Sequence, residues 1–347
     1  MTNAALEFRP MSIRPAPTEC DLDRATPVDQ ALEAHRRELT GYCYRMLGSG
    51  FEAEDAVQET LVRAWRGIDG FEGRSAFRSW LYRIATNVCL DMLRGSQRRA
   101  RPMDMGPSSP ADPAYLGALQ PELPWLLPIP DARVFDEDGD PAELAASRET
   151  IRLAFVAALQ HLPARQRAVL ILREVLRWQA TEVAELLDTT VASVNSALQR
   201  ARATLAAHAG DAGDPLVVRP VDPDQQALLA RYVDAFERYD IPRFVSLLRE
   251  DAFQSMPPFA MWIRGAQDIG AWMLGPGIDC QGSRMLATSA NGRPAFGQYR
   301  VDPNGGHTPW GLHVLEISNG RVIELTVFID LDTQLFAAFG LPTHLDE

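Results

Sequence analysis

The sequence predicts a multidomain protein in which two all-α units precede one α+β unit. Its 347 residues are enough for two or three domains of ordinary size. Apolar residues recur with helical spacing up to about residue 208, whereas the alternating apolar and polar runs typical of strands follow only later. Acidic breaks rich in proline or glycine divide the chain into four parts: a first helical unit (26–101), an acidic segment (102–147), a helix-turn-helix unit (148–208) and a third domain (222–347).

The composition is that of a soluble globular protein, with 46% hydrophobic and 23% charged residues. No apolar run approaches the roughly 18–20 residues that cross a bilayer, and the first 25 residues lack a secretory apolar stretch. We therefore expect a cytoplasmic protein that does not bind membranes. The four cysteines and six histidines show no metal-ligand spacing, and no phosphate-binding glycine loop occurs. Neither a metal nor a cofactor is expected, and the thiols are expected to be reduced.

The net charge of −12 hides two basic units, since the first helical unit sums to +2 and residues 148–205 to +3. All 34 basic residues are arginine, whose forked guanidinium suits phosphate and guanine. The acidic segment between these units holds nine prolines and nine acidic residues. Such a composition cannot continue a helix and is expected to bury little apolar area, so this segment is predicted to be a tether.

A helix is predicted from Ala76 to Arg94, because its apolar residues fall on one stripe. A neighbouring stripe carries Trp80, Arg83, Asn87, Asp91 and Arg94. The surrounding residues 74–101 contain seven arginines and several aromatic rings, a combination that suits unstacked bases. The alternative is an ordinary amphipathic helix whose arginines are simply solvated.

A second amphipathic helix is predicted just upstream. Its polar face presents Asp55, Gln58, Glu59 and Arg66, opposite a face of apolar residues. Taken alone, this pattern indicates no more than a solvated surface.

The stretch from Thr181 to Arg202 predicts a helix, a tight turn and a second helix. Ala184 provides the small residue where such helices cross, and Asp188 stands where most motifs of this kind have glycine. Aspartate tolerates left-handed geometry better than most residues. The second helix would expose polar groups that can reach base edges and phosphates: Ser193, Asn195, Ser196, Gln199, Arg200 and Arg202. Any helical hairpin of this length could imitate the pattern.

The third domain is predicted to begin with helices and to continue as an antiparallel sheet. Ser318-Asn319-Gly320 is a strong hairpin turn signal. The predicted elements are helices at 224–238, 241–249, 266–274 and 333–339, a short strand at 252–256, and strands at 284–290, 294–301, 311–318 and 321–330.

Together these motifs resemble the sigma-70 family of bacterial RNA polymerase sigma factors, specifically the extracytoplasmic-function (ECF) group, over about residues 30–205. The group keeps conserved regions two and four, joined by a linker. The stretches that carry the resemblance are His35–Leu47, Ala53–Arg66, Phe77–Asp91, and Leu162–Arg167 with the helix-turn-helix. The resemblance implies partners, namely core RNA polymerase and promoter DNA, and a function, namely promoter recognition and transcription initiation.

The resemblance also implies residue roles. Asp55, Gln58, Glu59 and Arg66 would bind core polymerase. The minus-ten element would be bound by Arg74, Arg78, Trp80, Arg83, Asn87, Asp91 and Arg94. The minus-thirty-five element would be read by Ser193, Asn195, Ser196, Gln199, Arg200 and Arg202. The acidic segment would repel DNA and favour a positively lined polymerase channel along the RNA path, which is a hypothesis from charge alone.

The third domain resembles the SnoaL-like (polyketide-cyclase-type) α+β cone. Some relatives of that fold are enzymes, so Asp279, Asp330, Tyr299, His307 or His313 could be catalytic, although ordinary strand-end polar residues and core aromatics are the favoured explanation. No catalytic residue is assigned, and the chain is expected not to be an enzyme. We favour regulation, with the cone packed on region two or four; a small molecule or an anti-sigma factor is its candidate partner. The alternatives are a DNA-binding ligand sensor that works without polymerase, and an isomerase or cyclase in the cone.

Overall fold

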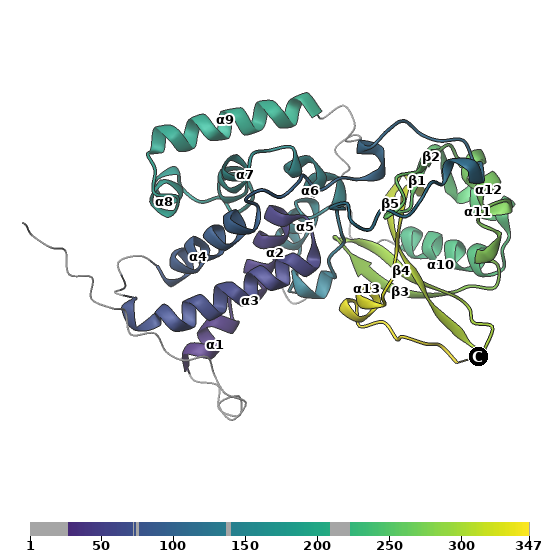
Figure 1. The fold of residues 1–347 in the computed structure, drawn as a ribbon, viewed down its shortest axis with the longest axis horizontal. Helices are drawn as coiled ribbons and strands as arrows, with labels where there is room; N and C mark the ends of the chain where they lie inside the picture. The colour runs from purple at the N-terminus through teal and green to yellow at the C-terminus, as the bar shows by residue number, and fades with distance from the viewer. Residues whose placement is uncertain (1–26, 72, 74–75, 137–139, 209–222, 347) are drawn as a thin grey trace, which may run out of the picture.

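The structure is a computed structural model in which an all-α part lies beside an α+β part (Figure 1). It describes residues 27–71, 73, 76–136, 140–208 and 223–346.

The first helical unit is formed by α1 (Pro27–Glu33), α2 (Arg36–Leu47), α3 (Gly50–Gly67) and α4 (Phe77–Met92), with a short 3₁₀ turn, η2 (Ile68–Gly70). The two helices expected from the apolar stripes are confirmed as α3 and α4. Ser49 caps α3 by accepting a hydrogen bond from the Glu52 amide, and Gly48 ends α2 in the left-handed conformation with φ 73°. These caps fix the tight corner between α2 and α3.

The helix-turn-helix unit is formed by α5 (Pro141–Glu149), α6 (Leu153–Gln160), α7 (Ala164–Leu170), a π-helical turn (Ile171–Val175), α8 (Ala180–Leu186) and α9 (Val191–His208). The predicted turn after α8 is confirmed, because Asp188 takes a left-handed φ of 49°. Ala184, Val194 and Leu198 are buried between these helices.

The third domain is confirmed as an α+β fold with one six-stranded sheet in the order β2-β1-β6-β5-β4-β3. Only β1 and β6 run parallel. The sequence missed β2, since three residues are too few to show alternation. The elements are α10 (Pro223–Glu237), α11 (Ile241–Leu247), β1 (Leu248–Ser255), β2 (Trp262–Arg264), α12 (Ala266–Leu274), η8 (Ile278–Cys280), β3 (Arg284–Ala290), β4 (Arg293–Val301), β5 (His307–Ser318), β6 (Arg321–Ile329) and α13 (Gln334–Ala338).

The two faces of this sheet are covered differently, as the alternation of side chains along a strand requires. On β5, His313 and Leu315 face the core beneath α10–α12. The opposite face forms a second apolar cluster that includes Leu312 and Val314. Side chains from the rest of the chain close that second face: Phe51 of α3, Leu127 of the acidic segment, Leu153 of α6, and the C-terminal Phe339 and Leu341.

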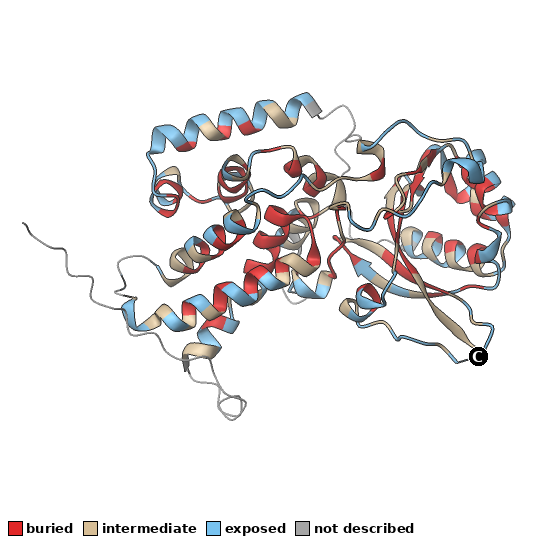
Figure 2. Ribbon diagram, viewed as in Figure 1, coloured by how far each residue is buried: buried red, intermediate tan, exposed pale blue. Residues whose placement is uncertain are grey.

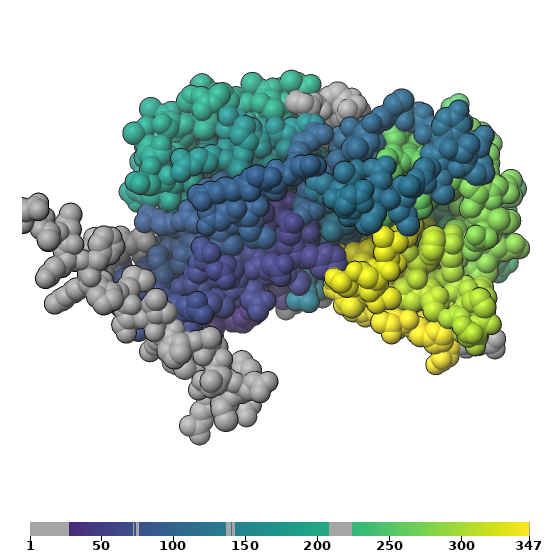
Figure 3. Space-filling model, viewed as in Figure 1, coloured from purple at the N-terminus to yellow at the C-terminus, as the bar shows by residue number. Residues whose placement is uncertain are grey.

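The expectation that the acidic segment is a loose tether is wrong. Its described residues form three short 3₁₀ turns, η3 (Pro102–Asp104), η4 (Pro113–Tyr115) and η5 (Asp131–Arg133), and its last residues begin α5, yet it lies across the third domain (Figures 1 and 3). The Ser109 amide donates to the Trp262 carbonyl on edge strand β2, at 2.8 Å. Trp125, Leu126 and Ile129 are almost fully buried. Prolines prevented a helix around these residues, but Leu126 and Ile129 pack into the core of the helical units and Leu127 packs against the sheet of the third domain.

Three described cysteines, Cys43, Cys89 and Cys280, are buried free thiols, and Cys20 lies outside the described residues. Among those described residues, no helix is long and apolar enough to cross a membrane.

Candidate polymerase and nucleic-acid interfaces

The polar face of α3 is open to solvent. Ala56, Val57 and Thr60 are buried on the opposite side of this helix. Of the predicted polymerase-binding residues, all four lie together on the exposed side of α3: Asp55, Gln58, Glu59 and Arg66. Glu59 accepts a hydrogen bond of 2.6 Å from Arg63 one turn later, so part of this face is ordered before any partner binds.

The predicted minus-ten residues on α4 divide into two groups. Arg83, Asn87, Asp91 and Arg94 are exposed, whereas Arg78 and Trp80 are half-buried. Arg74 lies outside the described residues. The structure therefore places five of the seven residues on α4 and Arg94 two residues past its end, and four of these six are exposed.

The two half-buried side chains have partners within the first helical unit. Trp80 packs on Phe71 and Phe77, with ring centroids 5.1 and 5.7 Å apart. The Arg78 guanidinium donates a 2.8 Å hydrogen bond to Glu38, which was not singled out in the sequence. Glu38 also accepts a long 3.4 Å contact from the Tyr82 hydroxyl. One carboxylate thus orients an arginine and a tyrosine on α4.

The helix-turn-helix unit packs against this same part of α4. Arg83 donates a 2.9 Å hydrogen bond to the carbonyl oxygen of Glu185 in α8. The Trp178 ring lies 5.0 Å from the Tyr82 ring, and the Arg78 guanidinium lies 5.5 Å from the centre of Trp178. In this arrangement the surface of α4 around Arg78, Tyr82 and Arg83 is occupied by protein. No sequence pattern predicted this contact, because the residues that form it are about 100 positions apart in the chain.

A groove of about 820 Å³ lies next to this contact. Its walls are the exposed side of α4 and the end of α8. It is lined by Arg83, Asn87, Leu90, Arg165, Glu185, Leu186, Leu187 and Asp188. The charges on its walls are mixed, so the groove does not select one sign of ligand.

The second helix of the helix-turn-helix, α9, exposes its polar side along its length (Figure 2). Thr190 caps its start by accepting a 3.2 Å hydrogen bond from the Ser193 amide, a role that the sequence did not assign. Arg200 contacts Ser196 at 2.6 Å and Arg202 pairs with Glu174 at 2.6 Å. All six predicted minus-thirty-five residues are exposed: Ser193, Asn195, Ser196, Gln199, Arg200 and Arg202.

The five candidate catalytic residues of the third domain do not converge on one site. Asp330 accepts hydrogen bonds from amides at the start of α13, and the Tyr299 hydroxyl donates to the Pro342 carbonyl at 2.8 Å. His307 contacts the Gly282 carbonyl, whereas Asp279 is exposed. These are structural contacts of strand and helix ends.

His313 is buried beneath the helices that cover the sheet, against Tyr232 and Phe236. Its Nε2 donates to the Gln298 amide oxygen at 2.8 Å, so its Nδ1 accepts from the Tyr232 hydroxyl at 2.9 Å. Gln298 donates onward to the Ser283 hydroxyl at 3.0 Å. Burial lowers the pKa of His313 to about 3, so the ring is neutral at pH 7. Because both ring nitrogens are engaged, this chain of hydrogen bonds satisfies a buried histidine.

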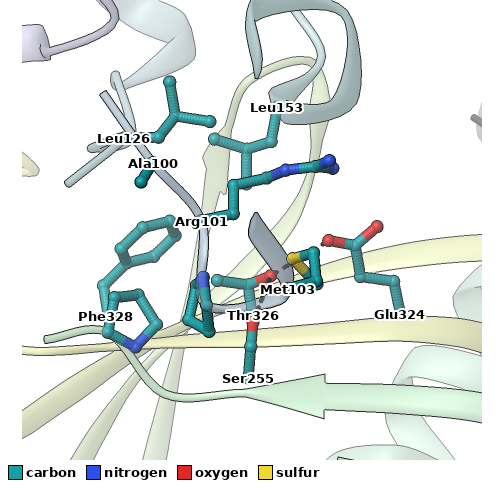
Figure 4. A pocket seen from close by; sticks show the side chains of 11 residues that line it. Ala100, Arg101, Met103, Leu126, Leu153, Ser255, Glu324, Thr326 and Phe328 are labelled. Carbon is teal, nitrogen blue, oxygen red and sulfur yellow. Dashed lines mark hydrogen bonds between the residues drawn. The ribbon is translucent and has the colours of Figure 1, made fainter. Parts of the chain in front are cut away.

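The interface between the acidic segment and the sheet contains a cavity of about 10 Å³, enough for about one water molecule. It is lined by Arg101, the residue just before the acidic segment, and by Glu324 of β6 (Figure 4). Burial raises the pKa of Glu324, and the nearby Arg101 opposes that shift. Within the described part of the chain, no group of three or more His, Cys, Asp or Glu residues could hold a metal ion.

Comparison with known proteins agrees with this geometry. The model of Sigma-70 region 2 matches residues 31–99, and that of Sigma-70 region 4 matches residues 152–205. A helical unit and a helix-turn-helix unit of these kinds define a sigma-70-type transcription factor. The chain is 47% identical over 315 residues to the ECF RNA polymerase sigma factor SigG of Mycobacterium tuberculosis, covering 90% of this chain and 83% of that protein. It belongs to the ECF RNA polymerase sigma factor family.

Two further comparisons extend into the third domain. The probable ECF sigma factor SigI of M. tuberculosis is 24% identical over 309 residues, covering 88% of this chain and 94% of that protein. The crystal structure of M. tuberculosis SigJ has a similar fold, with a TM-score of 0.56 at 23% identity, covering 90% of this chain and 99% of that one. The whole arrangement, third domain included, thus has a counterpart in a solved sigma factor.

Proposed function

We propose that this ECF sigma factor binds core RNA polymerase through the exposed face of α3, captures the melted minus-ten strand on α4, and reads the minus-thirty-five element with α9. The observation that carries this proposal is the placement of two separate polar helix faces, on α3 and α9, at solvent-exposed positions of family-matched units. A sensor that worked without polymerase would have no use for the α3 face.

The test is transcription with M. tuberculosis core polymerase on templates selected from a random DNA library by the wild-type holoenzyme. Asp55→Arg and Glu59→Arg should each weaken core binding at least tenfold, since each reverses a charge on the docking face. Glu250→Arg makes the same change at an exposed site of the third domain and serves as the control. If the wild-type chain neither binds core nor directs transcription, the proposal is wrong.

The third domain is proposed to regulate the sigma factor by packing on the rest of the chain. The covered sheet face supports this role, because α3, α6 and the acidic segment all contribute to it. Truncation after His208 should therefore change the amount of transcript made by the same core enzyme. Unchanged initiation would count against regulation. The isomerase or cyclase alternative gains no support from the five candidates, which do not converge.

The acidic segment is proposed to enter the polymerase along the RNA path, as its charge suggests. In the present arrangement it is held on the third domain, so it must detach first. Neutralising its acidic residues should alter polymerase affinity and abortive initiation, and the idea fails if both are unchanged. An anti-sigma partner, a small-molecule ligand and the cytoplasmic location stay predictions from the sequence.

A further inference from the structure

The turn between β3 and β4, formed by Asn291 and Gly292, is buried between domains. Asn291 has no exposed surface and takes a left-handed φ of 57°. The same dipeptide recurs in the same domain at Asn319-Gly320, where the β5–β6 turn is exposed. Two hairpin turns of identical sequence therefore lie in opposite environments, and only the first one contacts other parts of the chain.

Asn291 joins three segments that are far apart in the sequence. Its side-chain nitrogen donates to the Tyr44 hydroxyl of α2 at 2.7 Å and to the Ile151 carbonyl between α5 and α6 at 2.8 Å. Its side-chain oxygen accepts from the Ile129 amide of the acidic segment, and its own amide donates to the Ile129 carbonyl, both at 3.1 Å. Each N–H group of this residue, on the side chain and on the backbone, is thus bonded to a part of the chain outside the third domain.

The neighbours of Asn291 extend the contact. The Gly292 amide donates to the Asp131 carboxylate at 2.7 Å. Glycine is required at position 292 for two reasons: a β-carbon there would lie 2.8 Å from the β-carbon of Arg148, and φ is 70°, which favours glycine. Arg293 then donates to Glu149 of α5 at 2.7 Å. The turn and the following Arg293 are thus complementary to the start of the helix-turn-helix unit in shape and in charge.

The same junction carries the anchors of the helix-turn-helix unit on the first helical unit. Arg45 of α2 donates to the Thr150 carbonyl at 3.0 Å, one residue before Ile151. Arg167 of α7 donates to the Met46 carbonyl at the end of α2. Ile151 lies two residues before α6, which leads into α7 and α8.

We propose that the Asn291 turn (Asn291 and Gly292) is an intramolecular lock that holds the helix-turn-helix unit over the part of α4 around Arg78, Tyr82 and Arg83, and that promoter DNA binding requires its withdrawal. This inference rests on the proposed function. The α3 face is exposed while the lock is closed, so core polymerase can bind without releasing it. A weakened lock should therefore increase transcription while leaving core affinity unchanged. A change that merely damaged the fold would lower both.

The experiment uses the full-length chain with Asn291→Ala, Tyr44→Phe, and Asn319→Ala as the matched control. Asn291→Ala should accelerate amide hydrogen exchange in residues 125–131 and 148–153 at least tenfold and raise transcript yield at least threefold with core affinity unchanged. Tyr44→Phe removes the hydroxyl that accepts from Asn291 and donates to the Leu127 carbonyl, and it should shift both measurements in the same direction by less. Asn319→Ala should behave as wild type.

The lock is refuted if Asn291→Ala and Asn319→Ala exchange alike and give equal transcription, or if the gain in exchange comes with no gain in transcript. If Asn291→Ala unfolds the third domain, Tyr44→Phe decides, because it leaves the turn intact. A wild-type chain that does not activate core polymerase would overturn the proposed function instead, so the two failures are distinguishable.

Discussion

Replacing Arg167 with alanine measures how firmly the helix-turn-helix unit is held against the first helical unit. The guanidinium is 4% exposed. It donates to the Met46 carbonyl of α2, to the Gln160 side chain at 2.7 Å, and to the Gln160 and Leu162 carbonyls at 3.3 and 3.2 Å. One side chain therefore joins the end of α2 to the α6–α7 corner.

The size of the effect follows from two opposing contributions. Burial lowers the pKa of Arg167 to about 10, which means that the charged guanidinium is destabilised by about 3 kcal/mol relative to water. Alanine would recover that energy but strand at least three buried acceptors, at about 1–3 kcal/mol each. With the middle of that range for three acceptors, the free energy of unfolding should fall by about 3 kcal/mol.

The chain has several domains, so a single unfolding curve would not report on this contact. Hydrogen exchange of the α2 and α7 amides at low urea gives the local free energy of opening. Arg165→Ala, an exposed neighbour on the same helix, should change it by less than about 0.5 kcal/mol. If the Arg167→Ala variant loses less than about 1 kcal/mol in both helices, the reasoning from stranded acceptors is wrong.

Three further predictions concern DNA reading and pH. Asn195→Ala should cost about 1–3 kcal/mol in discrimination between promoter sequences, measured by holoenzyme binding to matched and mismatched templates, and an equal loss on every sequence would contradict base reading. Burial raises the pKa of Asp131 to about 6, above its value of about 4 in water, so the docked carboxyl takes up a proton more readily. Docking of the acidic segment on this turn should therefore strengthen as the pH falls from 7 to 5, because the protonated carboxyl no longer bears the cost of burying a charge, although Gly292, Arg148 and Arg293 favour the charged form. Exchange at residues 125–131, relative to the intrinsic rate at each pH, should slow, and Asp131→Asn should remove the dependence. The pH dependence that His313 contributes has the opposite sign. Because burial lowers its pKa to about 3, the third domain should lose thermal stability below about pH 6.5. His313→Gln should reduce that loss.

The local features of this chain were predictable because they depend on neighbours in the sequence. Apolar spacing located α3 and α4, and the polar residues between the apolar ones proved to be the exposed faces. Asp188 adopts the left-handed turn conformation expected between α8 and α9. The roles of these faces in binding polymerase and DNA remain predictions, because exposure shows only that they are available.

The contacts between domains were not predictable, because they depend on residues that only folding brings together. Proline spacing correctly excluded a helix around Trp125, but it could not indicate that the acidic segment would lie on β2. Tyr82 was part of a recognised motif, yet nothing near it in the sequence pointed to Trp178 as its partner.

The two Asn-Gly turns show the division most clearly. In each, the dipeptide determines a left-handed backbone, since asparagine and glycine adopt positive φ at little cost. Whether the asparagine then faces water, as Asn319 does, or bonds to three other segments, as Asn291 does, is decided by the surfaces opposite it. The sequence by itself determined most of the secondary structure and the exposed helix faces; only the tertiary structure decided that α4 is covered around Tyr82 and that Asn291 holds the junction.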